Sequence, residues 1–143
     1  MIKVCLKSTV SLTMKAKAIE NMLSAQILID QKQFTPSVHC SYYAVFQYMK
    51  HMLANTTNNP ITLAIQDAHK GDSSHEYILT EIKNRINARP QIVRTFTENV
   101  RFLKNERVEA DYHQKKFNDI ESLTCKDRAE GLITNLKTFF GNI

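Results

Sequence analysis

Apolar side chains recur at helical spacing along five stretches of the chain, and short polar segments separate these stretches. Positions three and four apart share one face of an α-helix, so each stretch predicts a helix with an apolar face. The expected helices span about 12–32, 35–54, 73–86, 91–112 and 124–140. Residues 61–70 fit either a short helix or an irregular crossing, and both alternatives stay open.

The same spacing predicts which side chains form the core. The first helix offers Leu12, Ala16, Ile19, Leu23 and Gln26, widened by Met22, Ala25 and Ile29. The second offers Val38, Tyr42, Val45, Met49 and Met52, widened by His39, Phe46 and Leu53. The third offers His75, Ile78 or Leu79, Ile82 and Ile86; the fourth offers Val93, Phe96, Val100 and Leu103. The last offers Ala129, Leu132, Ile133, Leu136, Phe139 and Phe140.

Residues that cap helices mark several of the predicted ends. Thr35 precedes Pro36 and is expected to cap the second helix, because proline fits the first helical position. The pairs Ser73/Glu76 and Thr124/Asp127 predict N-terminal caps for the third and last helices. Gly141 predicts the end of the last helix.

The composition favours an all-α fold in one domain. The chain has 143 residues, with only three glycines and three prolines. All-β folds spend both residue types on many turns, so their scarcity indicates long helices. We expect an up-and-down four-helix bundle with an additional short helix over 11–143, after a lead-in at 1–10 that is a short strand or frayed. Glycine-rich phosphate loops of the P-loop and Rossmann kind are absent from the sequence.

Charge and cysteine usage bear on partners and compartment. The net charge is +5, of which +4 lies in residues 1–71. This excess fits either an anionic partner or ordinary solubility. Three widely spaced cysteines without a C-x-x-C motif indicate reduced thiols in a cytoplasmic protein, and Cys40 is expected to be an unreactive thiol. The sequence shows no signal peptide or apolar run long enough for a membrane helix, and we expect no membrane partner.

The most informative local feature is the polar end of the fourth helix. Arg107 and Asp111 continue the apolar stripe, so they are expected to face other helices and to pair at spacing i, i+4. One interpretation is an internal ion pair that fixes helix packing. The other is a site, because Arg107 and His113 form R-x5-H, in which arginine holds a phosphate and histidine moves protons. Six positions on an ideal helix place these two side chains on different faces, so the helix must end between them or a second subunit must contribute one.

The remaining candidate residues give weaker patterns. The five histidines have no metal-binding spacing, so we expect no metal and no cofactor. Tyr42, Tyr43 and Tyr48 fit the core better than a base-stacking surface, although tyrosines can stack on bases.

Four segments in order resemble the HEPN-domain family, in its A-D-Y branch. The second helix, SVHCSYYAVFQYMKHML, is similar to that family's A-V-x-x-A-Y-Y-A-x-F helix. FLKNERVEADYHQKKF resembles its R-x-x-A-D-Y element, here Arg107, Ala110, Asp111 and Tyr112. GDSSHEYILTEI resembles the segment that carries a Ser-His pair, and SLTCKDRAEGLITNLKTFFGNI resembles the closing helix.

The resemblance implies a helical bundle that pairs as a homodimer through its second and fourth helices. Many family members are metal-independent ribonucleases with R-x4–6-H, in toxin–antitoxin, phage-defence or RNA-processing roles, and others are encoded beside a minimal nucleotidyltransferase. Carried onto this chain, Arg107 and His113 would be catalytic. Asp111, Tyr112, Tyr42 and His39 would support them or bind substrate.

Two functional hypotheses therefore remain. The first is a toxin-like endoribonuclease that cuts RNA without a metal. The second is a non-catalytic HEPN module that binds a nucleotide or a partner nucleotidyltransferase, with Arg107 and Asp111 as a structural lock.

Overall fold

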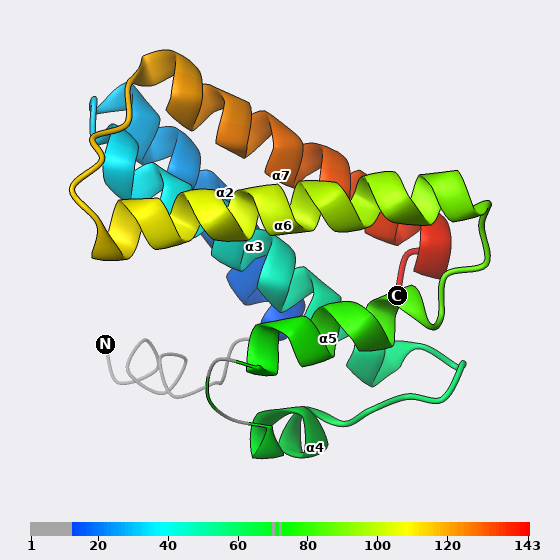
Figure 1. The fold of residues 1–143 in the computed structure, drawn as a ribbon. Helices are drawn as coiled ribbons and strands as arrows, with labels where there is room; N and C mark the ends of the chain where they lie inside the picture. Colours follow the sequence, from blue (N-terminus) through cyan, green and yellow to red (C-terminus); the bar gives the residue numbers. More distant parts are fainter. Residues whose placement is uncertain (1–12, 70, 72) are drawn as a thin grey trace, which may run out of the picture.

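Helices form all the regular secondary structure of the residues that the computed structural model describes, which are 13–69, 71 and 73–143. Four long helices are α2 (Met14–Asp30), α3 (Phe34–Asn55), α6 (Pro90–Tyr112) and α7 (Asp119–Phe140). Two short helices, α4 (Leu63–Ala68) and α5 (Ser74–Lys83), lie between α3 and α6 (Figure 1). The all-α bundle is therefore confirmed, and residues 61–70 contain a short helix. The predicted lead-in at 1–10 and the core position Leu12 lie outside the described residues.

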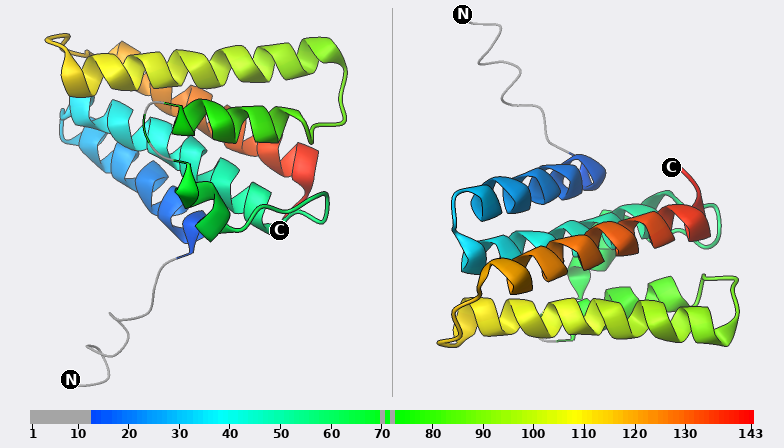
Figure 2. Two further views of the ribbon diagram at one scale, coloured as in Figure 1. Left: turned by 60° about the horizontal axis from the view of Figure 1, so that its bottom comes forward. Right: turned by 90° about the horizontal axis from the view of Figure 1, so that it is seen from above.

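Helix α3 lies at the centre of the bundle and packs against all five other helices. Seen along the layers, α2 covers one side of α3 and α7, and α6 covers the other side (Figure 2). The predicted stripe of α3 is buried along its whole length: Val38, Tyr42, Val45, Met49 and Met52 are at most 1% exposed. Burying this continuous apolar face is the main source of stability for such a bundle.

The core faces of α5, α6 and α7 also follow the sequence pattern. Their buried members include Ile78, Leu79, Ile82, Phe96, Val100, Leu103, Ala129, Leu132 and Leu136. His39, by contrast, does not widen the core face of α3 as expected, because its side chain is 48% exposed. It lies at the edge of that face, where α6 ends.

The predicted core face of α2 is wrong in part. Ala18, Ala25 and Ile29 are buried against the bundle, whereas Ile19 and Leu23 are mostly exposed. The apolar residues of α2 surround much of the helix, so their spacing fits two different faces equally well. Small alanines let α2 approach α3 closely, and this packing decides which face is buried.

The helix caps differ from the sequence prediction at three starts. α3 begins at Phe34 rather than after Thr35, whose hydroxyl instead accepts a hydrogen bond from the Phe117 amide at 3.1 Å. Ser73 precedes α5 but makes no side-chain cap. α7 begins five residues before Thr124, at a capping box formed by Asn118 and Glu121.

The predicted end of α7 is confirmed. Gly141 follows the helix with φ of 87°, a left-handed value that suits a residue without Cβ.

Candidate functional site

Arg107 lies near the C-terminal end of α6 and points into the bundle. Its guanidinium carbon is 5.3 Å from the Tyr42 ring centroid, 5.4 Å from that of Tyr43 and 5.8 Å from that of Tyr112. The side chain is only 7% exposed. The faces of the rings attract the cation and partly offset the cost of removing it from water. The expectation that Arg107 faces other helices is confirmed.

Asp111 joins Arg107 to a histidine of α3. Its Oδ2 lies 3.8 Å from Arg107 Nη1, which confirms the predicted i, i+4 pair. The same oxygen lies 2.7 Å from His39 Nδ1. An ionised carboxylate only accepts hydrogen bonds, so Nδ1 of His39 carries the proton and donates it. Nε2 is then the basic nitrogen of an imidazole whose side chain is 48% exposed.

This pair depends on how two helices meet. The C-terminal end of α6 runs beside the N-terminal part of α3, so His39 and Asp111 face each other from separate elements (Figure 1). On α3, His39, Tyr42 and Tyr43 follow at i, i+3 and i+4, which places all three on the side toward Arg107. The His39 ring also packs on Tyr43, at 4.6 Å between centroids.

A second histidine reaches the same tyrosines from α5. The Tyr42 hydroxyl lies 2.7 Å from His75 Nδ1, and the His75 ring stacks on Phe46 at 4.3 Å between centroids. Burial lowers the pKa of His75 to about 4, and the nearby cations Arg107, Lys104 and Lys50 add to this effect. Burial also raises the pKa of Tyr42 far above its usual value. His75 is thus neutral at pH 7 and Tyr42 keeps its proton.

His113 lies where the sequence analysis required it, just beyond the end of α6. It is the C-cap residue, with extended backbone, and its amide donates to the Glu109 carbonyl at 3.3 Å. The side chain is exposed, and it makes no hydrogen bond or ion pair with the part of the chain that the structure describes. Within one chain, therefore, Arg107 and His113 share no hydrogen bond, and the role predicted for His113 stays a prediction.

The structure gathers most of the other predicted site residues into one cluster. We call His39, Tyr42, Tyr43, His75, Arg107, Asp111 and Tyr112 the Arg107 cluster. Tyr112 belongs to the cluster because its ring centroid lies 5.8 Å from the guanidinium carbon of Arg107, although the residue is 72% exposed. The sequence favoured a core position for Tyr43 and placed His75 on the core face of its helix, although the HEPN resemblance also put His75 in a Ser-His pair. Their spacing alone could not show that one flanks a guanidinium and the other bonds Tyr42, because both contacts cross between helices.

The cluster contains two histidines, which can transfer protons, and a guanidinium, which can bind an anion. Among residues 13–69, 71 and 73–143 no group of three histidine, cysteine or acidic side chains could hold a metal ion. Cys40, beside the cluster on α3, has its pKa raised by burial and by Asp111, which fits an unreactive thiol. No helix of the described part is long and apolar enough to cross a membrane.

Comparisons with known proteins add no relative: no family model, no curated protein and no solved structure matches the chain.

Proposed function

We propose that the chain is a HEPN-type endoribonuclease that cleaves RNA without a metal, at the Arg107 cluster. The observation that carries the proposal is the shared carboxylate of Asp111, which contacts both His39 and Arg107. One oxygen thus orients an exposed imidazole beside a guanidinium. A general base and a cation for the phosphate are the two groups that such cleavage requires.

The reaction that these groups fit is transfer of the phosphate to the ribose 2′-oxygen. Nε2 of His39 takes the proton of the 2′-hydroxyl, and that oxygen attacks phosphorus to form a 2′,3′-cyclic phosphate. The P–O5′ bond breaks, and the 5′-oxygen takes a proton from an imidazolium. Asp111 stabilises the protonated His39, as a carboxylate does in other acid–base pairs. Arg107 stabilises the charge that develops on the phosphate oxygens. His113 is the second acid–base candidate for protonating the leaving oxygen.

The burial of Arg107 favours a second candidate, a non-catalytic module. The guanidinium is 7% exposed and lies between tyrosine rings. Its Nε is buried without a hydrogen-bond partner among these residues. In this reading Arg107 and Asp111 lock α6 to α3, and the exposed surface beside them binds a nucleotide or a nucleotidyltransferase encoded nearby.

The deciding experiment compares variants of the purified chain on a mixed-sequence RNA in excess EDTA. We expect the wild type to release products with 2′,3′-cyclic phosphate ends. His39→Ala should lower the cleavage rate by a factor of 10² to 10⁴, the usual contribution of a positioned acid–base group. Arg107→Lys should lower it by at least tenfold, because an ammonium cannot replace the two parallel N–H donors. His113→Ala measures whether the second histidine also contributes.

His51→Ala is the matched control, because His51 also lies on α3 but bonds the Ile143 backbone oxygen far from Arg107. This variant should cleave like the wild type. Absence of cleavage by the wild type, or cleavage unchanged in His39→Ala and Arg107→Lys, would overturn the ribonuclease. The lock is supported instead if Arg107→Ala unfolds at lower temperature while no variant affects RNA.

A further inference from the structure

The outward face of α2 carries an unpartnered apolar stripe. Ile19, Leu23 and Ile27 are 50%, 62% and 61% exposed. They follow at i, i+4 and i+8, so they stand one above another along more than two turns. Single exposed aliphatic residues are ordinary on a protein surface, but three in register form a patch of the kind found at interfaces.

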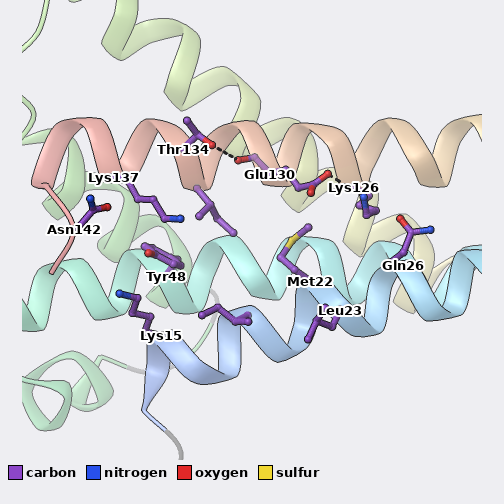
Figure 3. A pocket seen from close by; sticks show the side chains of 12 residues that line it. Lys15, Met22, Leu23, Gln26, Tyr48, Lys126, Glu130, Thr134, Lys137 and Asn142 are labelled. Atoms are coloured by element: carbon purple, nitrogen blue, oxygen red, sulfur yellow. Dashed lines mark hydrogen bonds and ion pairs between the residues drawn. The ribbon is translucent and has the colours of Figure 1, made fainter.

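A groove runs beside this stripe, between α2 and α7. Its volume is about 580 Å³, and Tyr48 of α3 contributes to its floor (Figure 3). Its apolar lining includes Met22, Leu23 and Ile133. Among the residues that the structure describes, α2 is the one helix in the layer outside α3 and α7 (Figure 2).

The two ends of the groove differ in charge. Lys15, Lys137 and Tyr48 lie at one end, and Lys126 and Glu130 pair with each other at the other end (Figure 3). Lys15 Nζ donates a hydrogen bond to the Ile143 backbone oxygen at 3.3 Å, but neither Lys15 nor Lys137 pairs with an acidic side chain of the described residues. The first end therefore favours an occupant that brings a negative charge to it.

We propose that the occupant is α2 of a second copy of this chain, packed antiparallel across a two-fold axis at Leu23. In this arrangement Leu23 meets its own counterpart, and Ile19 of each copy meets Ile27 of the other. A two-fold interface must be complementary to itself, and this stripe meets that requirement because Leu23 is its midpoint. Antiparallel packing also places opposite helix dipoles side by side.

The charges along α2 also favour antiparallel pairing. Lys15 and Lys17 lie near its start, and Asp30 is its last residue. Asp30 is seven positions after Leu23, so it lies on nearly the same face as the stripe. Pairing about Leu23 carries Asp30 of one copy to the Lys15 end of the other, where Lys137 also lies. The lysine end of each groove then receives a carboxylate.

The chain's own N-terminal segment fits this groove poorly by charge. Residues 1–12 contain Lys3 and Lys7 and no acidic residue. Placing them along α2 would add positive charge beside Lys15 and Lys137, which is unfavourable. A second α2 brings Asp30 to the Lys15 end of the groove, so it is the occupant that the charges favour.

The test measures the molar mass of the full chain in solution by light scattering after gel filtration. We expect Leu23→Asp to halve the mass and to weaken self-association roughly a hundredfold, because two leucines lose their burial and two carboxylates meet. Ile120→Asp is the matched control: Ile120 is 76% exposed on α7, and this variant should keep the wild-type mass. A monomeric wild type, or a Leu23→Asp chain with the wild-type mass, would overturn the proposal. The second of these results would place any dimer on another face, such as that of α3 and α6.

Two further variants test the register. Leu23→Cys should form a disulfide between copies under mild oxidation, whereas Ile120→Cys, with the same native cysteines, should not. Asp30→Lys should weaken the dimer about tenfold, and Lys15→Asp combined with Asp30→Lys should restore it. Equal cross-linking at both cysteine positions, or no rescue by the exchanged charges, would contradict the antiparallel pairing.

Discussion

The buried position of Arg107 follows from the sequence, but this position is compatible with two different functions. A charged residue that continues an apolar stripe must either find partners inside or raise the free energy of the fold. Arg107 finds three aromatic rings and a carboxylate, yet its Nε has no hydrogen-bond partner among the described residues. A donor left unpaired at this cost is a common feature of binding sites, because a ligand can satisfy it. The same unpaired Nε is expected if the aromatic rings and Asp111 hold the guanidinium in a purely structural role.

At the same scale, His75 leads to a prediction about how the free energy of unfolding changes at acidic pH. Burial and nearby cations lower its pKa from 6.5 to about 4. Between these two values the unfolded chain binds more protons than the folded chain, so the free energy of unfolding falls as the pH falls. After discounting for partial exposure, we expect His75 to account for about 1–2 kcal/mol of this loss. The effect should be complete near pH 4 and absent above about pH 7.

His75→Gln removes the titrating group while keeping a polar partner for Tyr42. Urea denaturation at pH 7.5, 6.5, 5.5 and 4.5 gives the free energy of unfolding of both proteins. The variant should lose less stability than the wild type over this range. Parallel curves for the two proteins would show that His75 does not carry the effect.

At the scale of the helix, the sequence predicts best where one face alone is apolar. The stripe of α3 is unambiguous, and its five predicted members are all buried. On α2 the apolar residues surround much of the helix, so spacing could not choose between the face of Ala18 and Ala25 and the face of Leu23. Spacing predicted the Arg107 cluster only within α6, and the family resemblance added Tyr42 and His39 of α3 as candidates. His39 and His75 join it through contacts between helices, which a spacing rule within one helix does not contain.

The start of α7 provides a direct comparison between a predicted cap and the observed one. The Asn118 side chain accepts from the Glu121 amide at 2.8 Å, and the Glu121 side chain accepts from the Asn118 amide at 3.2 Å. Thr124 lies inside the helix, where its hydroxyl donates to the Ile120 carbonyl. Removing a cap costs about 1 kcal/mol, whereas a hydroxyl that bonds four residues back within an exposed helix adds little stability.

Asn118→Ala should therefore lower the free energy of unfolding by about 1 kcal/mol. Thr124→Ala should leave it within about 0.5 kcal/mol of the wild type. Both values follow from thermal unfolding monitored by circular dichroism at 222 nm. A larger loss for Thr124→Ala than for Asn118→Ala would mean that α7 effectively begins near the position expected from sequence.

At the scale of the whole molecule, α3 and α7 separate the two surfaces that carry the proposals. α2 packs on one side of this layer, while the Arg107 cluster is built where α5 and α6 meet α3 (Figure 2). The central α3 contributes to both, but through different faces: His39 and Tyr42 point toward α6 and α5, and Tyr48 contributes to the floor of the α2 groove. Self-association through α2 would thus leave the cluster of each copy uncovered.

This separation predicts that dimerisation and RNA cleavage respond to substitution independently. Leu23→Asp should halve the molar mass and change the cleavage rate per chain by less than about twofold, because sites without shared partners behave additively. His39→Ala should abolish most cleavage and keep the mass of the wild type, and the double variant should show both losses. Cleavage that disappears in Leu23→Asp while its circular dichroism and melting temperature match the wild type would instead mean that the reacting groups come from two copies paired through α2. His39 and Arg107 of one chain would then not suffice for the reaction.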